Sequence, residues 1–521
     1  MRTSSCHWSP LSLTTLAVAA TVSIVAPAQR AFAADDYLSK ANALYNDVKS
    51  NKSADKILFP VLAKIENPPS VLVDAKRSAM LLSTMSDFEK VKPWVDAKPQ
   101  RDVIDAVKTV TSEEDWKKCF QISQPYGADA VEKIDPELVI NKMYTELGEP
   151  ALLAQAEFLY MKKLDSLELL MHAEANRLVG EGKTADAMDQ LVRLCWIGRM
   201  MAQREFQTEK SWGLNCMTLA LMHLRDIAYR DSRLEQPVLK AEEVRSIVRR
   251  LKANAMLGID RITPPAGNRI AAEQLVAQLM TPGAGPDPER WGPIMARIRS
   301  KNRPLRMFSE SAKWDGIRGL HANTSETAKR VAGVFDDFAL RWGLVPFDPR
   351  LKTPSDYAQL DRGKFALVDA MVADLDELAG QRNILTVEAA GTRMSLAAYA
   401  FILAQRRQPP DLASTRPAII DTNDIDPMDP GRKRFLGYVI PPTGKDLQIV
   451  VFPEFLGVRT PSFQVLVPST SYIVYSVGPD GVDNQGRRFT QTVPDDKGDY
   501  LIWPPVLSLS RQNLMDSGSL K

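Results

Sequence analysis

The segment Gly391-Thr-Arg-Met-Ser-Leu-Ala-Ala-Tyr-Ala-Phe-Ile-Leu-Ala-Gln-Arg-Arg-Gln-Pro-Pro410 marks the point where the hydrophobic period of this 521-residue chain changes. From position 365 to 403, apolar residues recur every three or four positions, as on one face of an α-helix. Pro409-Pro410 ends the pattern, because proline has no backbone N–H to continue a helix. We therefore predict one long helix over about 364–407, with Gly380 and Gly391 as weak points or bends.

After the two prolines, the apolar residues alternate with a period of two, which is typical of β-strands. Five short segments are rich in β-branched and aromatic residues and are separated by turn-forming residues. They cover 437–440, 447–452, 463–467, 472–477 and 500–503. The last third of the chain is therefore predicted to be one long helix packed on a small antiparallel sheet.

The N-terminal two-thirds of the chain have the pattern of helical hairpins. Apolar residues between 153 and 178 keep helical spacing, and Gly180-Glu-Gly-Lys183 ends that helix. Thr184 is a suitable N-cap for the next helix, which keeps its period to Met201. Two such helices joined by a short glycine turn form an αα-hairpin. No repeat of fixed length follows, so a regular solenoid is not predicted.

These patterns predict a mainly α protein with an α+β C-terminal domain. The expected divisions are a signal peptide at 1–33, a helical region at 34–260, a Pro/Gly-rich linker or loop at 261–304, a helical connector at 305–363, a helix-plus-sheet domain at 364–505 and a C-terminal tail at 506–521.

The first 33 residues have the order of a secretory signal peptide. Arg2 is followed by an apolar stretch from 11 to 28 and by Ala31-Phe-Ala33, a small-x-small cleavage site. A permanent N-terminal anchor is the alternative, but serine and threonine dilute the apolar stretch. No later segment is long and uncharged enough to span a membrane. We expect a periplasmic or secreted protein without a membrane span after cleavage.

The net charge of the chain gives no electrostatic reason to expect binding to nucleic acid. Cleavage would remove Arg2, Arg30 and no acidic residue, which lowers the formal charge from +2 to 0. The cysteines left are Cys119, Cys195 and Cys216, too few for a disulfide framework. One bridge between Cys195 and Cys216 and a set of buried free thiols are both compatible with the sequence.

Near the C-terminus, a loop rich in glycine and acidic residues follows the strand at 472–477. It reads Gly478-Pro-Asp480-Gly-Val-Asp483-Asn-Gln-Gly486, and Asp499, further along the chain, supplies a third carboxylate. Calcium binds six to eight oxygens, and glycines let backbone carbonyls turn towards such an ion. A hairpin in which the aspartates simply form turns has the same composition.

The C-terminal part resembles the globular domain of type II secretion major pseudopilins. It also resembles uncharacterised secreted planctomycete-type proteins with the same tail. The similarity is carried by Ala397-Ala-Tyr399 with Pro409-Pro-Asp-Leu412, by Asp426-Pro-Met-Asp-Pro430 with Gly437-Tyr438, and by Tyr475-Ser-Val-Gly-Pro-Asp-Gly481 with Gly498-Asp499.

The resemblance covers about residues 385–503. It implies a structural Ca²⁺ bound by the side chains of Asp480 and Asp499, with Asp483 as an added candidate. The prepilin signal and the apolar filament helix are absent from this sequence, and residues 487–497 lengthen the loop. The resemblance therefore concerns the domain and its metal, not a filament subunit.

The sequence offers little support for catalysis. His172, His223 and His321 lack metal-ligand spacing, although Glu168 and His172 lie four residues apart. The acidic side chains that crowd a proline-containing loop, as paired carboxylates in a glycosidase do, are Asp421, Asp424, Asp426 and Asp429. Such Asp-Pro segments also form ordinary turns.

We therefore expect a structural or protein-interaction protein that is not an enzyme and that binds a cell-envelope protein partner through a surface of its helical N-terminal region. The alternative is a periplasmic hydrolase that uses carboxylates of the 421–429 loop; it requires that these side chains line an open cleft. A small-molecule binding module in the helical region is a third possibility. It requires an apolar pocket with a few convergent polar groups.

Overall fold

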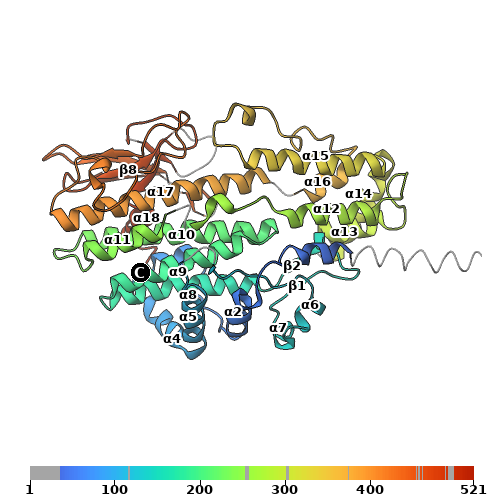
Figure 1. Ribbon diagram of the computed structural model, residues 1–521, viewed down its shortest axis with the longest axis horizontal. Coiled ribbons are helices and arrows are strands. Elements are labelled where there is room, and N and C mark those ends of the chain that lie inside the picture. The colour runs from blue at the N-terminus through green and yellow to red at the C-terminus, as the bar shows by residue number, and fades with distance from the viewer. Residues whose placement is uncertain are drawn as a thin grey trace, which may run out of the picture.

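The computed structural model describes residues 36–521 except 115–117, 253–256, 301–303, 373–374, 453, 456–457, 460–461, 487 and 491–497. The expected signal peptide at 1–33 lies outside the described residues. Helices form most of the molecule, and small sheets lie at one end of its long axis, around β8 (Figure 1). The predicted fold class, mainly α with an α+β C-terminal part, is confirmed.

Four long helices, α8, α9, α10 and α17, pack side by side at the centre of the molecule. In chain order, the α-helices are α2 Asp55–Leu62, α3 Ala75–Met80, α4 Phe88–Asp96, α5 Lys98–Val110, α6 Ala128–Glu132, α7 Pro136–Ile140, α8 Met161–Gly180, α9 Thr184–Ala202, α10 Gln207–Ser232, α11 Ala241–Arg250, α12 Ala266–Leu279, α13 Trp291–Ser300, α14 Pro304–Ile317, α15 Thr324–Trp342, α16 Ala366–Met371, α17 Leu375–Gln405 and α18 Val506–Asp516.

The predicted αα-hairpin is present as α8 and α9, joined by the turn at Gly182 (φ +74°). The first helix begins later than predicted, because Leu153–Gln155 forms a 3₁₀ turn and β2, Glu157–Phe158, pairs with β1, Thr145–Glu146. Thr184 is the first helical residue rather than the N-cap, which is Lys183 and makes no side-chain cap bond. Apolar spacing alone did not distinguish these short elements from a helix.

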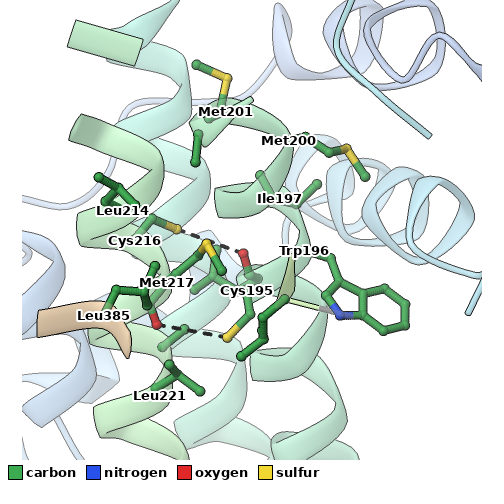
Figure 2. Close-up of a cluster of buried hydrophobic side chains, with 14 of the residues drawn as sticks. Cys195, Trp196, Ile197, Met200, Met201, Leu214, Cys216, Met217, Leu221 and Leu385 are labelled. Carbon is green, nitrogen blue, oxygen red and sulfur yellow. Dashed lines mark hydrogen bonds between the residues drawn. The ribbon is translucent and has the colours of Figure 1, made fainter. Parts of the chain in front are cut away.

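Helices α9 and α10 approach each other unusually closely. A Cβ placed on Gly213 would lie 2.4 Å from the backbone oxygen of Gly198 and from the backbone nitrogen of Ala202, so only glycine fits there. Figure 2 shows the adjacent core, where the Cys195 thiol points to the carbonyl of Met217 and the Cys216 thiol to that of Leu194. Cys195 and Cys216 are not joined by a disulfide, so the bridge left open by the sequence is not formed.

The predicted long helix is divided into two. Val372 has extended backbone angles (φ −77°, ψ 118°) and separates α16 from α17. Gly380 and Gly391, expected as weak points or bends, both lie inside the continuous helix α17. Gly391 has a packing role, because a Cβ there would lie 2.4 Å from the side chain of Ile502 on β10.

The linker or loop expected at 261–304 was wrong for most of its length, since it contains α12 and α13. Its prolines lie mainly outside these helices: Pro265 precedes α12, and Pro286 and Pro288 precede α13. Leu275, Leu279 and Trp291 are fully buried in the main core, which explains why the segment folds as helix despite its composition.

The C-terminal strands form two three-stranded sheets in the orders β10-β8-β3 and β7-β4-β9, with a short β5-β6 hairpin. Their bounds are β3 Gly437–Val439, β4 Leu447–Phe452, β5 Glu454–Phe455, β6 Val458–Arg459, β7 Phe463–Val467, β8 Ile473–Ser476, β9 Arg488–Thr490 and β10 Tyr500–Trp503. All five predicted strands are present. The sequence missed β9, which pairs in parallel with β4 inside the expected loop extension.

The first of these sheets is buried on both faces, so the C-terminal part has three layers. Val474 of β8 faces the main core against α17, and Ile473 and Tyr475 face a second core shared with Ile449 of β4. Every residue of β8 and β10 is buried. Alternating side chains therefore serve two different cores.

The expected C-terminal tail at 506–521 is instead the helix α18, which packs among the N-terminal helices. Arg511 donates to the carboxylate of Asp226 on α10 and to the carbonyl of Met80 on α3 (2.8 Å). The main core runs from Ala54 to Leu520 and includes residues of every expected division that the structure describes. The predicted boundaries therefore do not separate independent cores. Among the described helices, none has the length and apolarity needed to cross a membrane.

Candidate functional site

Asp426 organises the start of a hairpin formed by residues 425–435. One carboxylate oxygen accepts hydrogen bonds from the Ser476 hydroxyl (2.6 Å) and the Met428 N–H (3.0 Å), and the other accepts from the Val477 N–H (2.9 Å). The side chain is 1% exposed. Burial raises the pKa of Asp426, and these three donors act in the opposite direction. Asp426 therefore fixes the hairpin to β8.

Asp429 shapes the tip of the same hairpin. Its carboxylate accepts the N–H groups of Lys433 (2.8 Å) and Arg434 (3.1 Å), and the Asp426 N–H donates to the Arg434 carbonyl (2.9 Å). Ile425 and Phe435 face each other as an antiparallel bridge. Arg432 adopts a left-handed conformation (φ +50°) at the turn. The hairpin is thus held by its own carboxylates.

The other two acidic side chains of this loop are paired with cations. The Arg393 guanidinium, on α17, donates to Asp424 (2.6 Å) and to Asp421 (2.9 Å), and Lys252 donates to Asp421 (2.7 Å). The Lys252 ammonium lowers the pKa of Asp421 to about 2. The four aspartates of the loop form caps and ion pairs, and none lines any of the three cavities described in the molecule. The geometry required by the hydrolase alternative is not found there.

In the tail loop, the three aspartates proposed as metal ligands accept hydrogen bonds from protein donors. Asp480 accepts the Val482 N–H (3.0 Å), and Asp483 accepts the Tyr475 hydroxyl (3.0 Å) and pairs with Arg434. Asp499 accepts the N–H groups of Asn484 (2.9 Å) and Gly486 (2.8 Å). Burial raises the pKa of Asp499 to about 6.

Asp483 and Asp499 accept from protein donors at both carboxylate oxygens, whereas Asp480 accepts one N–H at one oxygen. N–H groups and a guanidinium bind anionic oxygens, whereas a calcium site needs several free oxygens directed at one point. Among the described residues, no three acidic, histidine or cysteine side chains lie together in a way that could hold a metal ion. The calcium site stays a prediction, tested by unfolding in excess calcium and in chelator, with Asp480→Ala as the variant. Residues 491–497 of the loop extension lie outside the described part of the chain.

The hairpin and the tail loop meet to form one surface, which we call the hairpin surface: Ile425, Arg432, Lys433, Phe435 and Val482. The Arg434–Asp483 ion pair joins the two segments, and Gly481 (φ +67°) lies so close to Pro430 that a Cβ there would approach its ring to 2.7 Å. The three apolar members are 44% (Ile425), 48% (Phe435) and 57% (Val482) exposed.

The two basic members of the hairpin surface are also exposed. Neither Arg432 nor Lys433 forms an ion pair with any residue that the structure describes. The sequence did not point to this surface, because its aspartates were considered only as candidate metal ligands or catalytic carboxylates. The run Gly431-Arg-Lys-Arg434-Phe435 between two turn segments was the signal that could have found it.

The helical histidines His172 and His223 form a buried pair between α8 and α10. Their Nδ1 atoms lie 2.9 Å apart, both side chains are 0% exposed, and both Nε2 atoms are unpartnered among the described residues. Burial lowers the pKa of His172 to about 3 and also lowers that of His223. Both rings are therefore neutral, as expected of histidines in a core.

A scan against models of protein families gave no match, and searches of curated proteins and of solved structures gave no significant match. The resemblance to pseudopilins therefore stays a prediction.

Proposed function

We propose that this chain is a structural or protein-interaction protein that is not an enzyme, and that its hairpin surface binds an acidic segment of a cell-envelope protein partner. The observation that carries the proposal is the exposure of Phe435 and Ile425 beside two unpaired cations on a hairpin held rigidly by buried carboxylates. The partner surface was expected on the helical region and is proposed here on the C-terminal part.

Rigidity supports a binding role for this hairpin. An exposed aromatic side chain contributes most to binding when its backbone loses little conformational freedom on association. Asp429 and Asp426 fix the backbone on both sides of the tip, and the neighbouring residues Met428 and Leu436 are 5% and 4% exposed. Phe435 is therefore a pre-organised apolar anchor.

The charge of the hairpin surface indicates the chemistry of the partner. Arg432 and Lys433 carry two positive charges at the tip, whereas Arg434 is neutralised by Asp483. A partner segment that combines acidic residues with one or two large apolar side chains complements this arrangement. The mature chain is neutral overall, so the attraction is local and does not extend to polyanions in general.

A displayed library of random peptides, selected on the purified full-length protein, tests the proposal directly. We expect enrichment of sequences that contain Asp or Glu together with Phe, Trp or Leu. Phe435→Ser and Lys433→Glu should each weaken binding of a selected peptide at least tenfold. Binding should also weaken as salt rises, because the Debye length is already ~10 Å at 0.1 M.

Leu320→Ser and Lys352→Glu are matched controls. Leu320 is 71% exposed and Lys352 is an exposed cation, and neither belongs to the hairpin surface. These controls should bind as the unsubstituted protein does. Selection of peptides without acidic residues, or equal binding by the Phe435→Ser and Leu320→Ser proteins, would show the assignment to be wrong.

We also propose that the protein acts in the periplasm or outside the cell, on the basis of the signal-peptide pattern at 1–33. Mass spectrometry of the N-terminus of protein isolated from the native cells tests this point. Cleavage after Ala33 is the expected result, and an intact first residue would contradict it.

A further inference from the structure

The largest of the described cavities has a volume of about 470 Å³ and lies where the 153–158 loop, α12, α13, α16 and the start of α10 meet. Volumes of ~300–1,000 Å³ are typical of small-molecule sites. In Figure 1, α12, α13 and α16 lie at the end of the long axis opposite the C-terminal sheet that contains β8. The cavity is therefore distinct from the hairpin surface.

Part of the cavity floor is apolar and aromatic, while most of the surface that lines the cavity is polar. The rings of Phe158 and Phe206 have centroids 5.5 Å apart, and Ile298 and Met371 complete the apolar lining. Phe206 is only 4% exposed and packs edge-on against Tyr126, with centroids 4.9 Å apart. This floor offers an apolar ligand a surface whose side chains are already ordered.

A buried polar network supports the floor from behind. Glu209 accepts hydrogen bonds from Tyr126 (2.8 Å) and Tyr160 and forms an ion pair with Arg204 (2.7 Å). The Arg204 guanidinium lies over the Tyr126 ring, 4.5 Å from its centroid, and donates to the Gln124 carbonyl (2.9 Å). The network holds Tyr126, and through it Phe206, in one position.

The rim of the cavity carries a net positive charge. It contains Arg299, Arg362 and Asp369. Asp369 is 3.4 Å from the Arg362 side chain and accepts from the Tyr357 hydroxyl at 3.4 Å, so both contacts are long. Arg299 is exposed and forms no ion pair within the described residues. One positive charge is thus left without an internal partner.

From this combination we propose that the cavity binds a small amphiphilic monoanion, an apolar chain or ring that carries one carboxylate. The apolar part would lie on the partly exposed side chains of Phe158, Ile298 and Met371, and the carboxylate would reach Arg299 and Arg362 at the rim. A planar guanidinium binds a carboxylate through two parallel hydrogen bonds. A neutral ligand would leave the arginines unused, and a cation would be repelled by them.

Titration calorimetry of the full-length protein with decanoate, decanol and decyltrimethylammonium, each below its aggregation concentration, tests the proposal. We expect saturable 1:1 binding of decanoate, with decanol at least fivefold weaker and no binding of the ammonium. Absence of saturable decanoate binding, or equal affinity for decanoate and decanol, would contradict the proposal.

Variants locate the binding and separate charge from shape. Arg299→Gln and Arg362→Gln should each weaken decanoate about fivefold, as expected for a partly exposed charge pair, without changing decanol. Ala370→Phe, which fills the cavity, should abolish binding of both ligands. Lys352→Gln removes an exposed cation outside the cavity and should bind normally. Decanoate binding that survives in the Ala370→Phe protein, with its unfolding temperature unchanged, would place the ligand elsewhere and overturn the assignment.

Discussion

Individual buried carboxylates of this protein act mainly as acceptors for backbone and side-chain donors. Asp426, Asp429 and Asp499 each accept at least two backbone N–H groups. A carboxylate that satisfies two donors in a tight turn stabilises a backbone geometry that uncharged turn residues could not hold.

Asp426→Asn should therefore destabilise the protein by about 2 kcal/mol. The new NH₂ group would replace an acceptor facing either the Val477 N–H or the Ser476 hydroxyl, which leaves a buried donor unsatisfied. Urea-induced unfolding measures the effect. Asp421→Asn is the control, because the Asp421 side chain is 60% exposed and should change stability by less than about 1 kcal/mol. Equal losses for both variants would contradict the argument.

Glu168 and His172 lie on one face of α8, and their contributions to the stability of the protein change with pH in opposite directions. Burial raises the pKa of Glu168 to about 8, so the folded state favours its protonated form. Burial lowers the pKa of His172 to about 3, so the folded state favours its neutral form. The stability associated with Glu168 is lost as pH rises from about 4.5 towards 8, whereas that of His172 is lost as pH falls from about 6.5.

The Glu168→Gln protein should consequently gain stability over wild type as the pH rises from 5 to 8. The unfolding free energies of the two proteins should diverge by roughly 3 kcal/mol over this interval, since Gln cannot ionise. Chemical denaturation at pH 5, 6.5 and 8 measures the difference. Glu89→Gln, at an exposed position of α4, should show no such divergence. A parallel pH dependence for Glu168→Gln and wild type would show that Glu168 is ionised in the folded protein.

At the scale of elements, α17 shows how glycines of one helix can have different roles. A Cβ on Gly380 would meet no atom within 4 Å, whereas one on Gly391 would overlap the Ile502 side chain of β10. The first glycine only adds freedom to the unfolded chain. The second allows the helix to lie directly on the sheet.

Gly380→Ala should stabilise the protein by about 0.5–1 kcal/mol, because alanine favours helix. Gly391→Ala should destabilise it by about 1–3 kcal/mol, because Ile502 must move out of a packed core. Thermal unfolding of the two variants side by side measures both effects. If both alanines stabilise, the close contact between α17 and β10 is wrong.

Elements with strong periodicity were predictable from the sequence, and elements defined by tertiary contacts were not. The strands at 447–452 and 463–467 were found at their observed bounds, since β-branched residues and flanking turns determine them locally. The end of α16 at Met371 was missed, because residue 372 is an apolar residue in phase with the helix. Strand β9 was missed because its pairing with β4 is non-local.

The candidate site was predictable only in part, for the same reason. The sequence singled out the aspartates at 421–429 and 480–499, and the Arg434–Asp483 ion pair does join the two segments, although the carboxylates do not gather at one point. Their partners are backbone N–H groups and arginines far away in the chain, such as Arg393 for Asp424, and no local pattern reveals them. The exposed apolar residues of the hairpin surface were likewise hidden, since an exposed Phe and a buried one look alike in a sequence.

At the scale of the whole molecule, the last helix and helices from the first half of the chain depend on each other. Helix α18 lies between α10 and α3, and Arg511 connects both of them through Asp226 and the Met80 carbonyl. Asp226 is 0% exposed and also accepts from Ser508 of α18. The chain therefore closes its main core only when its last sixteen residues are in place.

Arg511→Met should destabilise the entire protein by about 3–5 kcal/mol, because a buried carboxylate loses its cation. Hydrogen exchange should speed up in α3 and α10 as well as in α18, which reports one cooperative unit. Lys98→Met removes an exposed ion pair and should cost less than about 0.5 kcal/mol. Faster exchange limited to α18 would show that this helix unfolds separately from the rest.

The close crossing of α9 and α10 also gives the protein an internal reporter of its own opening. Burial raises the pKa of the Cys195 thiol to about 12 and also raises that of Cys216, so neither reacts while the two helices remain in contact. Cys119 is only partly buried and supplies a fast reference reaction in the same molecule. The alkylation rate of the two slow thiols relative to Cys119 thus follows the separation of these helices without any engineered label.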